Sequence, residues 1–298
     1  MDNIKIASVI VTYNRKDLLK KCLEANINQS YKLADIIVVN NASTDGTELL
    51  LEQFKNDNKD SNITIYNLGS NLGGAGGFNE GIKCAIKKNY DYYWIMDDDT
   101  IPNRDCLEKM VEKIHLVENN LGFLCSNVRF SDGNACIMNT PSVEPIWNHN
   151  ADKGLIELKS ASFVSILIRG TVIKEIGLPI KEFFIWGDDT EYTERITKNF
   201  KGYMVIDSIA HHLMKDNKPV NIIEDNPERI ERYFYEYRNK FFISKKYGFG
   251  AVLRYFKFVL RCSYNVITKS KSYKLKRLKS IYKGFFAGIT FNPKIESC

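Results

Sequence analysis

The stretch that decides the fold is Tyr92-Tyr-Trp-Ile-Met-Asp-Asp-Asp-Thr100. Its five apolar residues, bounded by polar ones, are typical of a strand buried on both faces. Three carboxylates follow directly and repel one another, so a divalent cation would remove an electrostatic cost. Asp97 and Asp99 can point to one side of an extended segment, where hard oxygen ligands suit Mg²⁺ or Mn²⁺. A solvated acidic turn, or a cap for the next helix, is the alternative.

Upstream of this stretch, apolar runs alternate with helical patterns. Strands are expected at 6–12, 35–40 and 63–66, and helices at 14–26, 47–54 and 78–88. This alternation predicts an α/β fold with a doubly wound sheet, parallel in this half, and right-handed crossovers. Ligands bind such sheets outside the carboxyl ends of the strands. Polar clusters follow the first, second and fourth strands, which is where that rule places a site.

The pattern changes after Asn119. The sequence predicts an antiparallel hairpin from segments 122–130 and 135–138, further strands at 155–158, 162–168 and 203–206, and a helix at 190–198. From Pro227 onward the chain is helical in pattern, basic and aromatic. We therefore expect a domain over residues 1–220 and a basic helical region over residues 221–298.

Charge is distributed unevenly along the 298 residues, although the net charge is only +6. From Arg229 to Cys298 there are 17 Lys and Arg against 3 Asp and Glu, a net charge of +14; the remainder carries −8. Hydrophobic residues make up 44% of the chain, which excludes a disordered protein. The seven cysteines lack zinc-site spacing and indicate a reducing cytoplasm. We expect no signal peptide and no membrane span.

The segment from Gly69 to Gly81 holds six of the 18 glycines. A flexible loop is one interpretation. We prefer a tight turn that enters helix 78–88, with its backbone groups close to a bound sugar or phosphate. The resemblance to GxGxxG is weak. A Rossmann oxidoreductase would need that motif after the first strand, where this chain has Thr12-Tyr-Asn-Arg15.

A second acidic cluster follows the aromatic run that begins at Phe183. A carboxylate beside apolar surface, such as Asp188 or Asp189, can accept a proton near neutral pH. Trp186 offers a flat face for a sugar ring. Helix capping by either aspartate is the alternative and is compatible with catalysis. For the adjacent pair His211-His212, a structural role and a metal-ligand role stay open.

Taken together, these segments resemble inverting glycosyltransferase family 2, which has a GT-A fold. The matching pieces, in the family's order over about the first 215 residues, are Val9-Ile-Val-Thr-Tyr-Asn-Arg15, Val38-Val-Asn-Asn-Ala-Ser-Thr-Asp-Gly-Thr47, Asn71-Leu-Gly-Gly-Ala-Gly-Gly-Phe78, Met96-Asp-Asp-Asp-Thr100 and Trp186-Gly-Asp-Asp-Thr-Glu191. The glycine-rich piece and the aspartate triplet are most similar to bacterial galactofuranosyltransferases, and next to rhamnosyltransferases. Arg232-Tyr-Phe-Tyr-Glu-Tyr-Arg-Asn239 resembles a tail motif of both groups.

The resemblance also implies roles for individual residues. Asp97 and Asp99 would hold Mn²⁺ or Mg²⁺ with His212 as third ligand, and Asp189 would be the general base. Acceptor contacts would come from Trp186 and Asp188. Nucleotide and donor contacts would come from Thr12, Tyr13, Arg15, Asn40, Asn41, Asn71, Gly74, Asp97 and Asp98, with Asp98 nearer the sugar. Many family members have Asp in place of Asn40, which makes the base less certain.

The implied activity is that of a hexosyltransferase that moves galactofuranose from UDP-galactofuranose to a glycan hydroxyl in cell-surface polysaccharide synthesis. The alternatives are a dTDP-rhamnose-dependent rhamnosyltransferase and a non-catalytic module that binds nucleotide sugars. Retention of Asp97, Asp99 and Asp189 argues against the module.

The basic tail leaves several interpretations open. Arg254–Arg261 and 269–283 mix cationic with aromatic or aliphatic residues. A solvated helix, an anionic membrane surface and pairing of subunits in a homo-oligomer all fit, whereas nucleic acid is not expected. Family members often act on lipid-linked glycans at the cytoplasmic leaflet. The resemblance therefore implies a lipid-linked acceptor and a peripheral location at the inner face of the cell membrane.

Overall fold

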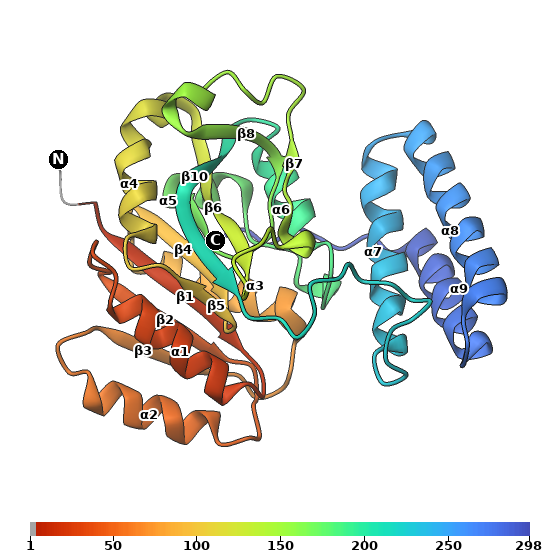
Figure 1. Cartoon of the computed structure of the whole chain (residues 1–298), viewed down its shortest axis with the longest axis horizontal. Helices are drawn as coiled ribbons and strands as arrows, with labels where there is room; N and C mark the ends of the chain where they lie inside the picture. Colours follow the sequence, from red (N-terminus) through yellow and green to blue (C-terminus); the bar gives the residue numbers. More distant parts are fainter. Residues whose placement is uncertain (1–3) are drawn as a thin grey trace.

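The computed structural model describes residues 4–298, and of residue 118 only the backbone. Residues 1–3 lie outside this range. They belong to the N-terminal segment for which the sequence predicts no signal peptide. One ten-stranded mixed sheet forms the centre, with strand order β3-β2-β1-β4-β9-β6-β10-β8-β7, and β5 pairs with β10 (Figure 1). The strands are β1 Ile6–Thr12, β2 Asp35–Asn40, β3 Ile63–Asn67, β4 Tyr92–Asp97, β5 Thr100–Pro102, β6 Leu121–Phe130, β7 Ser142–Val143, β8 Leu155–Ser160, β9 Ile166–Arg169 and β10 Lys201–His212.

Helices cover both faces of this sheet, as the α/β pattern predicts. One face carries α1 (Lys16–Ile27), α2 (Thr47–Asp57) and α4 (Cys106–Val117), which share one apolar cluster with the strands. The other face carries α3 (Gly73–Ile86), α5 (Gly170–Ile176) and α6 (Asp188–Ile196), which share a second. Two separate clusters explain why β1, β2 and β4 are almost continuously apolar.

The parallel strands bring distant polar residues to one edge. β1 lies between β2 and β4 and is parallel to both. β9 runs antiparallel to β4 and β6, and β6 runs parallel to β10, so β10 has the same direction as β4. The carboxyl ends of β1, β2, β4 and β10 therefore lie at the same edge.

The glycine-rich segment is helical from Gly73 onward, so the preferred interpretation placed the start of the helix wrongly. α3 begins at Gly73 instead of residue 78. A Cβ on Gly77 would lie 2.4 Å from Val11 Cγ1, which shows that glycine allows α3 to pack closely on β1. Gly73 has a φ of +73°, and a Cβ there would lie 2.0 Å from the carbonyl oxygen of Phe184.

Two other expectations are corrected. The predicted hairpin between 122–130 and 135–138 is reduced to one bridge from Arg129 to Ala135, because β6 pairs instead with β9 and β10. The strand predicted at 203–206 is part of the longer β10, which begins at Lys201 and includes both His211 and His212.

The C-terminal region is helical, as predicted. It contains α7 (Tyr233–Lys246), α8 (Phe249–Lys269) and α9 (Lys274–Thr290), at one end of the molecule in Figure 1. These helices share an apolar cluster that includes Tyr237, Tyr255 and Ile281. The chain then returns to the α/β part, where the Leu178 N–H donates to the Glu296 carbonyl. Within residues 4–298, no helix combines the length and apolarity needed to cross a bilayer.

Candidate active site

The aspartate triplet lies at the carboxyl end of β4, against the end of β1. Register pairs Val11 with Asp97, which places Thr12 beside the triplet. The Thr12 hydroxyl donates to Asp98 Oδ2 at 2.7 Å, and the Tyr13 N–H donates to the same oxygen at 3.4 Å. Arg15 Nη1 lies 3.3 Å from Asp98 Oδ1 and 2.6 Å from Asp99 Oδ2. Both oxygens of Asp98 are therefore occupied by protein groups.

Asp97, Asp99 and His212 form a compact group. Their nearest ligand atoms all lie within 4.8 Å of one another. The antiparallel pairing of β5 with β10 causes this proximity, because it sets Thr100 opposite His212. Buried Asp99 Oδ1 lies 3.0 Å from His212 Nε2 but accepts no well-aligned hydrogen bond among the described residues. Two carboxylates and an imidazole whose ligand atoms converge in this way fit a divalent cation.

The orientation of His212 depends on Asn139, a residue that the sequence did not single out. Asn139 Oδ1 lies 2.7 Å from His212 Nδ1. Since an amide oxygen only accepts, Nδ1 carries a proton. Loss of the other ring proton, as on metal binding, would leave the Nε2 lone pair on the side facing Asp99. Asn139 Nδ2 is in turn fixed by Ser162 Oγ at 2.9 Å. No sequence signal marks Asn139, since only the folded chain brings it beside β10.

We expect Asn139→Ala to weaken the affinity for Mn²⁺ by about 10- to 100-fold, because the imidazole loses the partner that fixes its orientation. Titration of Mn²⁺ followed by calorimetry measures the change. Asn134→Ala, at an exposed turn position, is the control. An unchanged affinity in Asn139→Ala would show that the hydrogen bond does not support metal binding.

Burial and the neighbouring charges shift the pKa values of these side chains. Burial, and then the charge of Asp99, raise the pKa of Asp97. Burial raises the pKa of Asp98 to about 6, although Arg15 opposes the shift. Burial would lower the pKa of His212, but the neighbouring Asp99 carboxylate raises it to about 10. Without a cation, Asp98 and His212 therefore retain protons that the unfolded chain releases. The pKa of Asp99 is instead lowered: burial would raise it, but the contact with His212 outweighs burial.

This proton retention predicts how stability depends on pH. Asp98 and His212 both have pKa values above their unfolded values of 3.8 and 6.5, so the folded state binds more protons and loses stability as pH rises. We expect the unfolding temperature of metal-free protein to fall by about 5 °C or more between about pH 5 and pH 9. Mn²⁺ should raise it more at the higher pH, since it competes with protons. Differential scanning calorimetry with and without Mn²⁺ tests both trends, and stabilisation that weakens with rising pH would contradict them.

The second acidic pair begins α6. Asp188 is buried, whereas Asp189 is partly exposed. Asp189 Oδ1 accepts from the Thr190 N–H at 2.6 Å and from the Thr190 hydroxyl at 3.3 Å. Burial raises the pKa of Asp189, and these bonds oppose the shift. Burial and the charge of Asp189 raise the pKa of Asp188 to about 8, and Asp189 is the more exposed member of the pair.

The predicted nucleotide-side residues divide into exposed and internal ones. Tyr13 and Arg15 are exposed beside the triplet, and a Cβ on Gly74 would meet nothing within 4 Å. Asn41 is buried, where its amide donates to Asn71 Oδ1 at 3.1 Å and to the Gly73 carbonyl at 2.9 Å. Asn41 therefore joins the end of β2 to the start of α3.

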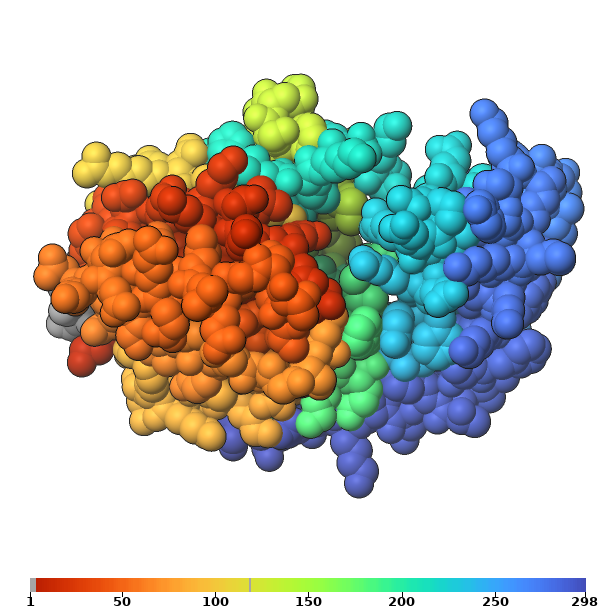
Figure 2. All heavy atoms as spheres, turned by 90° about the horizontal axis from the view of Figure 1, so that it is seen from below, coloured from red at the N-terminus to blue at the C-terminus, as the bar shows by residue number. Residues whose placement is uncertain are grey.

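Asn40 and Trp186 also have partners inside the protein. Asn40 donates to Asn67 Oδ1 at 2.9 Å and accepts from the Ser43 N–H at 3.0 Å. Trp186 packs against Tyr233, with ring centroids 5.1 Å apart. Figure 2 shows the surface hollowed between the N-terminal part, in red, and the cyan segment that leads into α7.

Comparisons of the fold place the protein in a class. The mannosyltransferase PcManGT from Pyrobaculum calidifontis, in complex with GDP-Man and Mn²⁺, aligns with a TM-score of 0.59 and 16% identity, over 97% of this chain and 76% of its own. Staphylococcus aureus TarS 1–349, in complex with UDP-GlcNAc, aligns with a TM-score of 0.56 and 14% identity, over 95% and 73%. The fold is therefore that of the GT-A glycosyltransferases.

The sequence specifies the family more closely. The profile of glycosyl transferase family 2 matches residues 8–155. The galactofuranosyltransferase GlfT1 of Mycolicibacterium smegmatis is 25% identical over 266 residues, which cover 83% of this chain and 85% of that protein. The chain therefore contains a glycosyl transferase family 2 domain, matched over residues 8–155.

Proposed function

We propose that the protein is an inverting, metal-dependent galactofuranosyltransferase that uses UDP-galactofuranose. The metal dependence is supported by the convergence of Asp97, Asp99 and His212. The role of a general base is supported by the carboxylate pair Asp188 and Asp189 at the start of α6. The donor is supported by the similarity to GlfT1. dTDP-rhamnose remains the second candidate donor, because Asn40 departs from the family's usual aspartate.

In the proposed reaction, a single displacement at the anomeric carbon, different residues serve as the general base and as the ligands of the metal. Asp189 accepts the proton of the acceptor hydroxyl, whose oxygen attacks the anomeric carbon while the bond to the diphosphate breaks. Asp97, Asp99 and His212 would hold Mn²⁺ or Mg²⁺, which supplies Lewis-acid stabilisation of the departing diphosphate. Arg15 adds a positive charge at the same edge. A single base suffices, since inversion needs one displacement.

The acceptor and the location follow from the same proposal. A lipid-linked glycan would be glycosylated by enzyme bound peripherally at the inner face of the cell membrane. Residues 221–298 would form the region that binds the membrane or a second subunit, and residues 1–220 would form the catalytic domain. Trp186 and Asp188 would contact the acceptor, whereas Tyr13, Asn71 and Gly74 would line the donor side.

A panel of nucleotide sugars tests the proposal. The protein is incubated with Mn²⁺, a lipid-linked acceptor and each donor, and the released nucleoside diphosphate is measured. We expect release with UDP-galactofuranose that a chelator abolishes. Release only with dTDP-rhamnose would change the donor, and no release with any donor would favour a non-catalytic module.

A further inference from the structure

The outer face of α8 carries an exposed apolar stripe. Its members recur every three or four residues, which aligns them along one side of the helix; they are Phe249, Leu253, Phe256, Leu260, Tyr264 and Ile267. Another side of α8 is buried in the cluster shared with α7 and α9, through Tyr255, Val259 and Val266. α8 therefore has one apolar face inside the protein and another facing outward.

The stripe continues onto α9. Leu275, Tyr282, Phe286 and Ile289 are exposed along that helix. Phe285 joins the two helices, because its ring centroid lies 5.3 Å from that of Phe256 and 5.2 Å from that of Phe286. We call this combined surface of exposed apolar residues on α8 and α9 the outer apolar face. α8 and α9 lie at the end of the molecule away from the sheet (Figure 1).

Cations flank the outer apolar face without any acidic residue among them. The segment from Phe249 to Thr290 contains ten Lys and Arg and no Asp or Glu. Arg254, Lys257 and Arg261 are exposed and recur at helical spacing beside the stripe on α8. A second copy docked by two-fold symmetry would bring these cations together, whereas anionic lipid head groups would neutralise them.

We propose that the outer apolar face docks on an anionic membrane, with its aromatic and aliphatic side chains among the acyl chains and the flanking cations at the head groups. This inference deepens the peripheral location in the proposed function, but it rests on the surface of α8 and α9 and does not require the catalytic assignment. Apolar burial and attraction to anionic lipids both contribute to such binding.

Flotation with lipid vesicles, without donor, tests the docking face separately from activity. We expect the full chain to float with vesicles that contain phosphatidylglycerol, less with phosphatidylcholine alone, and less at high salt. The double variant Leu260→Ser/Phe286→Ser should lose about tenfold or more in partitioning, and Lys257→Gln/Arg261→Gln about tenfold or more on anionic vesicles alone. Leu49→Ser, at a 78% exposed leucine on α2, is the matched control.

Three outcomes would overturn the proposal. Wild-type protein could fail to float with anionic vesicles, or both double variants could float as well as wild type. A dimer in solution that Leu260→Ser/Phe286→Ser dissociates would assign the face to a second copy of the chain. The substituted residues are exposed, and circular dichroism of each variant verifies that its helices are retained.

An independent observation concerns the loop that leads to Asp188 and Asp189. Phe184 has φ 64° and ψ −57°, the centre of a strained γ-turn in which the Ile185 N–H donates to the Phe183 carbonyl at 2.7 Å. Trp186 has φ 65°, and Gly187 has φ 85°. Non-glycine residues at positive φ are costly and persist only where neighbouring contacts hold them.

Asn239 of α7 provides such contacts. Its side chain is 1% exposed, and its amide nitrogen donates to the carbonyls of Phe183 at 3.0 Å, Ile185 at 3.2 Å and Trp186 at 2.9 Å. Two N–H groups are thus shared among three carbonyl oxygens. Arg238 donates to Asn239 Oδ1 through Nε at 3.1 Å, which fixes the amide's orientation.

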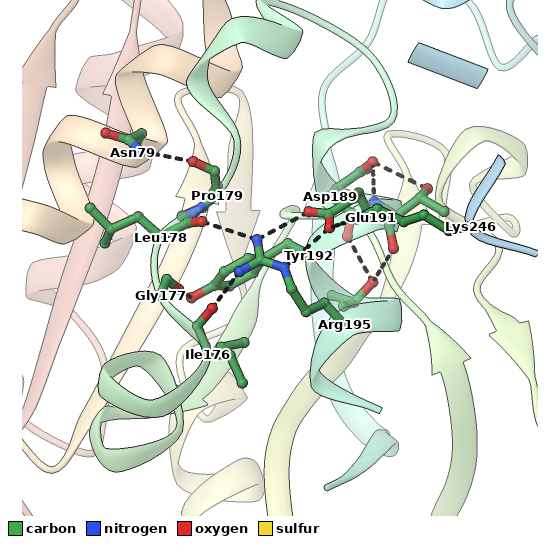
Figure 3. A network of polar contacts seen from close by, with 12 residues as sticks. Asn79, Ile176, Gly177, Leu178, Pro179, Asp189, Glu191, Tyr192, Arg195 and Lys246 are labelled. Atoms are coloured by element: carbon green, nitrogen blue, oxygen red, sulfur yellow. Dashed lines mark hydrogen bonds and ion pairs between the residues drawn. The ribbon is translucent and has the colours of Figure 1, made fainter. Parts of the chain in front are cut away.

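A second contact joins α7 to the helix that follows this loop. Lys246 Nζ lies 2.6 Å from the buried Glu191 carboxylate of α6, which also pairs with Arg195 at 3.0 Å (Figure 3). Glu191 therefore belongs to this ion network and not to the metal group. We infer that Asn239 is a positioning residue, which holds the loop in the backbone conformation that presents Asp188 and Asp189 to the acceptor.

Kinetics of Asn239→Ala test this role. We expect kcat to fall about tenfold or more, while the KM for the donor and the affinity for Mn²⁺ stay within about twofold. The reason is that Asp97 lies on β4 and His212 on β10, and neither belongs to the loop that Asn239 holds. Asn239→Ser keeps one hydrogen-bond donor, so its kcat should lie between those of wild type and Asn239→Ala. Lys240→Gln, on the exposed side of α7, is the control. Unchanged kcat in Asn239→Ala, or equal loss of kcat and of Mn²⁺ binding, would reject the positioning role. If the alanine variant does not fold, the same criteria apply to the serine variant.

Discussion

Asp97→Asn is expected to lower the rate of sugar transfer at least about a thousandfold. The substitution keeps the shape of the side chain but removes one of the two carboxylates of the metal group. Stabilisation of the leaving diphosphate amounts to several kcal/mol, and each 1.4 kcal/mol corresponds to about tenfold in rate. Nucleoside diphosphate release under saturating donor and Mn²⁺ measures the loss.

The same variant should gain stability in the absence of metal. Asparagine removes a charge that Asp98 and Asp99 repel, so the metal-free protein should unfold at a higher temperature than wild type. Higher stability with lower activity distinguishes loss of a ligand from loss of the fold. Asp57→Asn, at an exposed position on α2, is the control and should change neither quantity. Near wild-type activity in Asp97→Asn would contradict the assignment.

Asp189→Asn is expected to lower kcat by about 10²- to 10⁴-fold, because the acceptor hydroxyl loses its proton acceptor. The affinity for Mn²⁺ and the KM for the donor should change little, since Asp189 lies on α6 and outside the metal group. Steady-state kinetics with separate variation of donor and acceptor resolve these terms.

Asp188→Asn is the matched comparison. Asp188 is buried, and burial together with the charge of Asp189 raises its pKa, so it resembles a neutral hydrogen-bond donor more than a base. We expect a smaller loss, expressed mainly in the KM for the acceptor. The reverse pattern, with Asp189→Asn active and Asp188→Asn inactive, would exchange the two roles.

The pattern of apolar and polar residues along the chain predicted those elements whose formation depends mainly on residues close in sequence. The strands β1, β2 and β4 were predicted from continuous apolar runs, because burial on both faces leaves no room for polar residues. The hairpin after Phe130 was wrong, since its turn signals were real but β6 found partners elsewhere in the sheet. The start of α3 was missed because glycine is a poor helix former, and packing against β1 overrides that tendency.

In the site, too, the sequence predicted residues that lie in local motifs and missed residues that act through distant contacts. Asp97, Asp99 and His212 were predicted as one group from adjacent carboxylates and a resemblance, and the structure brings them together. Asn139 and Asn239 were not assigned roles, because each acts through a contact with a residue more than fifty positions away. Asn139 lies in no motif, and Asn239 ends the tail motif Arg232–Asn239, which by itself gives no indication of the loop that Asn239 contacts.

The most direct test of the account is a crystal structure with Mn²⁺ and the nucleoside diphosphate released in the donor panel, with anomalous data collected at the manganese edge. We expect one strong peak among Asp97, Asp99 and His212 Nε2, in contact with the diphosphate, and no peak there for Asp97→Asn. Diphosphate bound at this edge without a metal peak, or manganese bound at other residues, would contradict the central claim.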